Sequence, residues 1–196
     1  MNAERRTLDY LSKSNSLQVM KLKLAFLLCL AGLVVGAWAM SDQNSNEKLK
    51  IGDPVPQVAT EDQNGKLVNL AEIAGNRYFL VYFYPKSFTP GCTAQACSLR
   101  DAYKELQSKG VKIVGVSLDT VETQKKFQDA ENLPFELLSD RDKKVTSAFG
   151  VPIRVNSFAA RQAYLFKDGK LVWMDTKAST DKQAQDVLAV LAQRDK

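Results

Sequence analysis

The sequence has no histidine among its 196 residues. That absence excludes Ser-His-Asp and Cys-His catalysis as well as histidine-ligated metal sites, so a base or charge partner must be another side chain. Cysteine is scarce too, with three residues, Cys29, Cys92 and Cys97. Two thiols in a C-x-x-x-x-C spacing do not make a zinc knuckle, and the C-x-x-C redox spacing is absent. We therefore expect neither a metal ion nor another cofactor.

A strong excess of one charge is also missing from most of the chain. The formal net charge is +5, and residues 1–40 contribute +3 of it through five basic and two acidic residues. The remaining 22 basic and 20 acidic residues leave +2, scattered along the sequence. Nucleic-acid surfaces are strongly and locally basic. We therefore expect no nucleic-acid partner.

One long uncharged run stands near the beginning of the chain. Residues 24–39 carry no charge, Lys21 and Lys23 stand just before them, and Ala37-Trp38-Ala39 supplies small residues of a cleavage site. This is the pattern of a secretory signal. The run is short for a membrane span, but it can remain as an uncleaved anchor with its positive flank on the cytoplasmic side. Both readings predict that residues 1–40 target the chain for export, to the periplasm or beyond, or to a membrane with the domain outside the cytoplasm.

The boundaries of this segment follow from its neighbours. Met20 directly precedes the pattern, so residues 1–19 can be an over-predicted start. Cys29 lies within the apolar run, and we interpret it as membrane-buried and inert. Residues 41–49 are polar and are interpreted as a linker. Residues 50–196 have the length of one compact domain.

Apolar runs and turn signals predict an α/β domain. The run Tyr78–Tyr84 is apolar on both alternating faces, as expected for a buried central strand, and 112–118 is a second such run. The segments 163–166 and 171–174 are joined by Lys-Asp-Gly-Lys, a hairpin signal. Further elements are expected as a strand over 135–138 and as helices over 92–110, from Thr120, over 143–149 and from Thr180. This order predicts a thioredoxin-like fold, in which a mixed central sheet carries helices on both faces.

The stretch from Pro85 to Cys97 carries the chemistry. Cys92 follows a strand and a loop and begins a helix, where unpaired backbone N–H groups and the helix dipole favour an anion. Pro90-Gly91 allows a tight turn that keeps side chains away from the sulfur. We therefore predict an exposed, reactive Cys92 thiolate and redox chemistry at sulfur.

The same residues carry a resemblance to a known family. Pro85-x-x-x-Thr89-x-x-Cys92 resembles the active-site signature of peroxiredoxins. The longer match over 82–101 resembles the peroxiredoxin Q, or bacterioferritin comigratory protein, subfamily. Segments at 52–56, 137–140 and 161–169 fit in order, so the resemblance covers the chain from about residue 50.

This resemblance implies a thiol peroxidase for hydrogen peroxide or organic hydroperoxides, and a monomer. The Cys92 thiolate would attack the peroxide and become a sulfenic acid. Thr89, the Cys92 N–H and Arg161 would hold the peroxide, and Pro85 would shield the sulfenic acid from water. Cys97 would condense with Cys92 to a disulfide, which a thioredoxin-like protein would reduce.

The spacing of the two thiols has a structural consequence. In an intact helix their Cα atoms would be about 8–9 Å apart, on largely opposite faces, whereas a disulfide needs about 7 Å or less. The first helical turns must therefore unwind for the disulfide to form. A structural core role for Cys97 and a permanent disulfide both stay open, although the helical distance argues against the permanent disulfide.

Arg161 and the activity itself each admit a second interpretation. Arg161 can be a surface ion-pair residue, and the chain can be a redox-responsive binding or holdase module without turnover. Two positions depart from the family pattern: Gln95 stands where many members have glutamate, and Ala163 where threonine is frequent. Both leave the signature itself intact.

Overall fold

The computed structural model describes residues 48–154 and 158–194. The predicted targeting segment and most of the predicted linker therefore lie outside the described residues. Within these two ranges, no helix is both long and apolar enough to cross a membrane.

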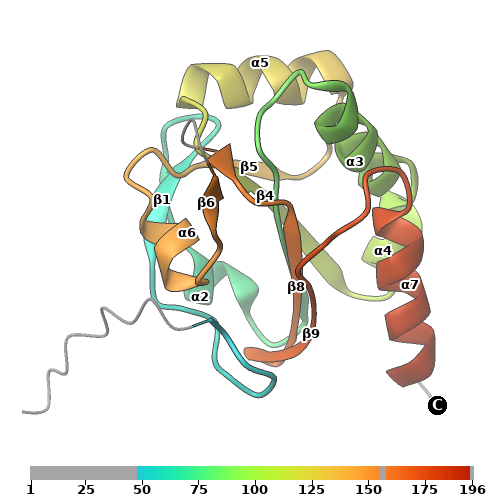
Figure 1. Cartoon of the computed structure of the whole chain (residues 1–196). Helices are drawn as coiled ribbons and strands as arrows, with labels where there is room; N and C mark the ends of the chain where they lie inside the picture. Colours follow the sequence, from blue (N-terminus) through green and yellow to red (C-terminus); the bar gives the residue numbers. More distant parts are fainter. Residues whose placement is uncertain (1–47, 155–157, 195–196) are drawn as a thin grey trace, which may run out of the picture. The chain divides into compact units, whose positions relative to one another are not determined.

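The described chain alternates strands and helices (Figure 1). The strands are β1 (Ala59–Asp62), β2 (Leu67–Asn69), β3 (Tyr78–Phe83), β4 (Val111–Ser117), β5 (Glu136–Ser139), β6 (Ile153–Arg154), β7 (Phe158–Ala159), β8 (Gln162–Lys167) and β9 (Lys170–Asp175). The helices are α2 (Leu70–Ala74), α3 (Pro90–Asp101), α4 (Tyr103–Ser108), α5 (Val121–Glu131), α6 (Lys144–Ala148) and α7 (Gln183–Arg194).

One mixed sheet organises the domain. Its strand order is β2-β1-β5-β4-β3-β8-β9, with β3, β4 and β5 parallel and the remaining pairs antiparallel. All six residues of β3 are buried, as its run of apolar residues predicts for a central strand. The strands β8 and β9 form the predicted hairpin around Asp168 and Gly169, both at positive φ. The prediction of a mixed thioredoxin-like α/β sheet is confirmed.

Helices cover both faces of this sheet (Figure 1). Alternate side chains of β3 enter two separate cores because a strand's side chains point to opposite faces. Leu80 and Tyr82 pack with α3, α4, α5 and α7, whereas Phe79 and Phe83 pack with α2 and α6. The face with α3 is the one that carries both thiols.

The predicted helix over 92–110 is two helices. The α3 helix ends at Asp101, and Ala102 leaves the helix at φ −91° and ψ 7° before α4 begins. Apolar spacing could not reveal this break, because Leu99 and Leu106 face the same core on either side of it. The final helix, predicted to begin near Thr180, begins at Gln183.

Candidate active site

The loop between β3 and α3, which precedes Cys92, is held in place by hydrogen bonds. The Ser87 N–H donates to Asp119 Oδ2 at 2.8 Å, and the Tyr84 hydroxyl donates to Gln124. Phe88 then turns the chain sharply at φ +63°, a left-handed conformation that is uncommon for a bulky residue. Thr89 follows as the N-cap of α3, with Pro90 at its first turn.

Cys92 lies in the first turn of α3 and is buried, with 1% of its surface exposed. The prediction of an exposed thiolate is therefore wrong. The reason is helical periodicity: Cys92, Ala96 and Leu99 share one stripe of α3, and this stripe packs on the sheet in one core cluster. A reactant must therefore reach a recessed sulfur.

Sheet register brings Arg161 to this sulfur. Gln162 on β8 pairs with Phe83 on β3, so Arg161, one residue earlier, lies at the edge where β3 passes into the loop. Its Nη2 lies 3.3 Å from Cys92 Sγ, and its Nη1 donates to Gln95 Oε1. The guanidinium thus contacts the thiol directly.

The close approach depends on a glycine. A Cβ on Gly91 would lie 3.4 Å from Arg161 Nη2 and 3.3 Å from Thr180 Cγ2. A side chain there would be tightly packed against Thr180 and would touch the guanidinium that faces the sulfur.

The buried side-chain amides of Gln95 and Gln183 connect Arg161 to α7 through hydrogen bonds. Gln95 Nε2 donates to Gln183 Oε1 at 2.9 Å, and both side chains are fully buried. Gln183 Nε2 has no partner among the described residues. Arg161 is therefore oriented by a neutral oxygen, and no carboxylate competes with the Cys92 sulfur for its charge in the described ion pairs.

Thr89 and Pro85 lie in the loop that precedes Cys92. The Thr89 hydroxyl donates to the Lys86 carbonyl at 3.0 Å, so its oxygen keeps lone pairs that can accept a further hydrogen. The Cys92 N–H, predicted to hold peroxide, already donates to the Thr89 carbonyl at 3.0 Å. Pro85 is half-buried directly after Tyr84.

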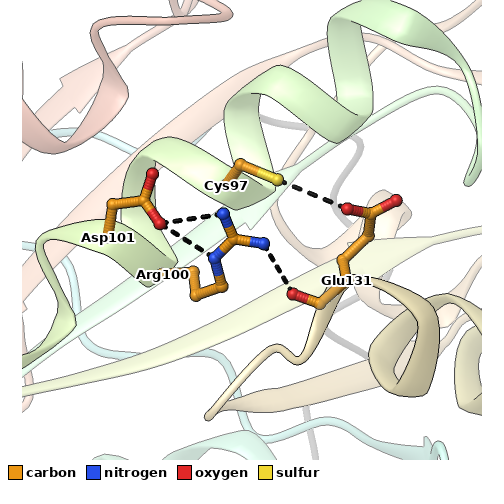
Figure 2. A network of polar contacts seen from close by, with 4 residues as sticks. All are labelled: Cys97, Arg100, Asp101 and Glu131. Atoms are coloured by element: carbon orange, nitrogen blue, oxygen red, sulfur yellow. Dashed lines mark hydrogen bonds and ion pairs between the residues drawn. The ribbon is translucent and has the colours of Figure 1, made fainter.

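Cys97 has a different environment at the other end of α3 (Figure 2). It is a free, half-buried thiol whose Sγ donates to Glu131 Oε2 at 3.5 Å. Burial raises the pKa of Cys97, and the hydrogen bond to Glu131 raises it further, while Arg100 acts in the opposite direction. Cys97 is thus held as a neutral thiol in the folded helix.

Tyr82 belongs to the same buried core cluster as Cys92. Its phenol packs so closely on Gly115 that a Cβ there would come within 2.7 Å of the Tyr82 hydroxyl. Burial raises the pKa of Tyr82 well above its usual range, with further upward contributions from Tyr84, Cys92 and Cys97. Tyr82 therefore stays neutral.

Sequence reasoning missed Gln183 and Glu131. Gln183 had a signal, because it shares the buried stripe of α7 with Val187 and Leu191 and is the polar member of it. Glu131 had none, since its contact depends on where α5 ends beside α3. Across the two described ranges, no group of three or more cysteine or acidic side chains could hold a metal ion.

Comparison with known proteins identifies the family of this site. A model of the AhpC/TSA family matches residues 51–174, and the chain belongs to that family. It is similar to proteins named peroxiredoxin, which confirms the resemblance seen in the sequence. Peroxiredoxin Bcp of Escherichia coli is 50% identical over 103 residues, covering 53% of this chain and 65% of the relative. The chain thus spans slightly less than two thirds of that relative's length.

Further matches extend over more of the domain. The chloroplastic peroxiredoxin Q of rice (Oryza sativa subsp. japonica) is 35% identical over 147 residues, covering 74% of this chain and 67% of the rice protein. The crystal structure of peroxidoxin BcpB from Mycobacterium tuberculosis is 31% identical with a TM-score of 0.68, covering 74% of this chain and 97% of that one. The bacterioferritin comigratory protein of Xanthomonas campestris is 25% identical with a TM-score of 0.68, covering 76% and 98%.

Proposed function

We propose that this chain is a thiol peroxidase that reduces hydrogen peroxide and small organic hydroperoxides. The observation that carries the proposal is the Arg161 Nη2 at 3.3 Å from Cys92 Sγ, in the first turn of a helix. A guanidinium and a helix N-terminus both favour the thiolate, which is the nucleophile. The Xanthomonas campestris relative is described by its alkyl peroxide reduction activity, which supports the same substrate class.

The chemical step follows from these groups. The Cys92 thiolate attacks the terminal peroxide oxygen, the S–O bond forms and the O–O bond breaks. Arg161 stabilises the negative charge that develops on the leaving oxygen, which departs as water or an alcohol after protonation. The Thr89 oxygen, whose own hydrogen is engaged by Lys86, accepts the hydrogen bond of the incoming hydroperoxide. Pro85 limits access of water to the sulfenic acid.

Cys97 completes the cycle as the resolving thiol. It condenses with the Cys92 sulfenic acid to a disulfide and water, after the first turns of α3 unwind. A thioredoxin-like protein then reduces the disulfide by thiol exchange. We propose that the chain acts as a monomer, which light scattering of the reduced protein would test.

Peroxide consumption by the full chain tests the proposed activity. The wild-type protein with thioredoxin and its reductase should consume peroxide, and Cys92→Ser should abolish this. Cys97→Ser is the matched control, because it should still reduce one equivalent of peroxide per Cys92 and then stop. Absence of peroxide consumption by the wild type with every thiol reductant would favour the redox-responsive holdase.

We also propose that the domain works outside the cytoplasm. The uncharged run 24–39 behind Lys21 and Lys23 supports export, with cleavage after Ala39 or retention as an anchor. Mass spectrometry of the protein from bacterial cells tests this. A new N-terminus between Ala39 and Ser41 in the periplasmic fraction supports cleavage, and the intact chain in the membrane fraction supports anchoring. An intact chain in the cytoplasm would contradict both.

A further inference from the structure

We propose that Glu131 latches Cys97 in the folded α3 helix, and that releasing this latch limits how fast the Cys92 sulfenic acid is resolved. The inference rests on the proposed peroxidase function, and it assigns a positioning role to a residue outside the signature. Glu131 is the last residue of α5 and comes from a different part of the chain, 34 positions after Cys97.

The geometry joins the last turn of α3 to the end of α5 (Figure 2). The Cys97 thiol donates to the Glu131 carboxylate, and Arg100 Nη1 donates to the Glu131 backbone carbonyl at 2.8 Å. Arg100 is itself held by Asp101, with Nε and Nη2 each 2.9 Å from Asp101 Oδ1. The side chain and the backbone carbonyl of Glu131 thus hold two α3 residues, Cys97 and Arg100, that lie about one helical turn apart.

The position of this latch fits the segment that must unwind. The α3 helix ends at Asp101, and the break at Ala102 separates it from α4. Unwinding can therefore stop at Ala102 without disturbing α4. Within this segment Cys97 and Arg100 make the described polar contacts with Glu131. The Cys97 contact must be lost for Cys97 to swing toward Cys92, and unwinding that reaches Arg100 also breaks the second contact.

The Glu131 contact affects the ionisation of the Cys97 thiol as well as its position. The charged or titratable groups that act on it are Glu131, Asp101, Arg100 and Tyr82. The carboxylates favour the neutral thiol and Arg100 favours the thiolate, with burial as the largest influence toward the thiol. In the folded helix Cys97 is therefore a poor competitor for peroxide. On leaving Glu131 it gains water and becomes easier to ionise.

The resolving step then balances as a condensation. The released Cys97 thiolate attacks the Cys92 sulfur, the S–S bond forms and the S–OH bond breaks. The hydroxide that leaves combines with the proton Cys97 has given up, which makes one water. A second peroxide competes for the same sulfenic acid and oxidises it to sulfinic acid. A strong Cys97–Glu131 contact thus favours oxidation of Cys92 to sulfinic acid, and a weak contact favours the disulfide.

Two substitutions separate the charge of Glu131 from its hydrogen bond. Glu131→Gln removes the charge and keeps an acceptor, while Glu131→Ala removes both and leaves the backbone carbonyl for Arg100. We expect disulfide formation to accelerate about twofold in the first and about three- to tenfold in the second, the size of one charged hydrogen bond near the surface. Sulfinic acid at Cys92 should fall at high peroxide in the same order.

Glu122→Gln is the matched control. Glu122 lies at the start of the same helix, where its described partner is Lys126 at 2.7 Å. This control should leave both the disulfide rate and the sulfinic acid yield at the wild-type level. Rapid acid quench followed by mass spectrometry of the peptide 87–100 reads out disulfide and sulfinic acid together. Unchanged or slower disulfide formation in Glu131→Ala would overturn the latch.

A titration without peroxide keeps the latch testable even if the peroxidase proposal fails. In Cys92→Ser the tryptic peptide 87–100 contains Cys97 as its only thiol, so its alkylation rate against pH gives the Cys97 pKa in the full chain. Glu131→Gln should lower that pKa, which a purely structural role of Glu131 would not do. Peroxide consumption without this pKa change would refute the latch alone. The pKa change without peroxide consumption would refute the proposed peroxidase alone.

Discussion

The two ends of α3 carry the two thiols in opposite surroundings. In the first turn, Cys92 is buried beside the Arg161 guanidinium, which neutral Gln95 orients. Near the last turn, Cys97 is half-buried against the Glu131 carboxylate. One thiol contacts a cationic group, and the other contacts an anionic group that helps to raise its pKa.

This difference assigns an order to the two thiols. In the proposed peroxidase cycle, Cys92 beside the guanidinium is the thiol that attacks peroxide. A thiol held by a carboxylate waits until the helix opens. One short helix therefore places two chemically identical groups against opposite charges, Cys92 beside a guanidinium and Cys97 beside a carboxylate.

Arg161→Lys should have the largest effect, because it removes the fork that defines the cationic end. A lysine keeps the charge but cannot contact both Gln95 and Cys92 with planar donors. We expect peroxide to oxidise Cys92 about 100-fold more slowly, the usual loss for one charge-stabilising donor. Stopped-flow kinetics measure this, and Arg141→Lys, where Arg141 donates to the Leu118 carbonyl, is the control. A loss below tenfold would mean that a positive charge at this position is sufficient and that the planar fork of arginine is not required.

Gln95→Glu should make the cationic end resemble the anionic one. The new carboxylate pairs with Arg161 and competes with the Cys92 sulfur for it. Gln183 can turn its amide so that the unpartnered Nε2 donates to the new carboxylate, so we expect the variant to fold. Cys92 oxidation should slow about fivefold. An equal or faster rate would show that the neutral amide has no special value here.

Gly91→Ala should separate stability from reactivity at the same end. Alanine should stabilise α3 by up to about 1 kcal/mol, since glycine is a poor helix former. Its Cβ would lie 3.3 Å from Thr180 Cγ2 and in van der Waals contact with Arg161 Nη2, so the local adjustment should slow peroxide oxidation about two- to fivefold. Adding Thr180→Ser removes the methyl at 3.3 Å and should restore part of the rate. Thermal unfolding measures the stability of Gly91→Ala, and stopped-flow kinetics measure its oxidation rate. A decrease in both stability and rate would contradict this explanation.

The raised pKa of Cys97 should make the stability of the fold depend on pH, and we expect this to be the smallest of the four effects. The folded protein raises the pKa of Cys97, so the native state holds this proton above the pH at which the unfolded chain releases it. The resulting stability is fully present below the ordinary thiol pKa and is lost as pH rises through the folded one. The free energy of unfolding of the reduced wild type, measured with denaturant, should therefore fall more steeply with pH in this alkaline window than that of Cys97→Ala. Equal slopes would contradict the raised pKa.

Most of the fold could be predicted because it is encoded in local spacing. The runs of β3 and β4 and the β8–β9 hairpin are each recognisable from a few consecutive residues. The break at Ala102 could not be predicted, because Leu99 and Leu106 keep one apolar stripe across it. The short strands β6 and β7, of two residues each, hold too few residues for a pattern.

The sequence by itself determined that two thiols share one helix, that no histidine can serve them and that the stretch has the peroxiredoxin signature. Only the tertiary structure decided their surroundings. Sheet register carried Arg161 across 69 positions to Cys92, and the packing of α3 buried that sulfur. The end of α5 placed Glu131 beside Cys97. Charges within a few ångströms govern a thiol, and which charges come so close depends on how distant elements pack.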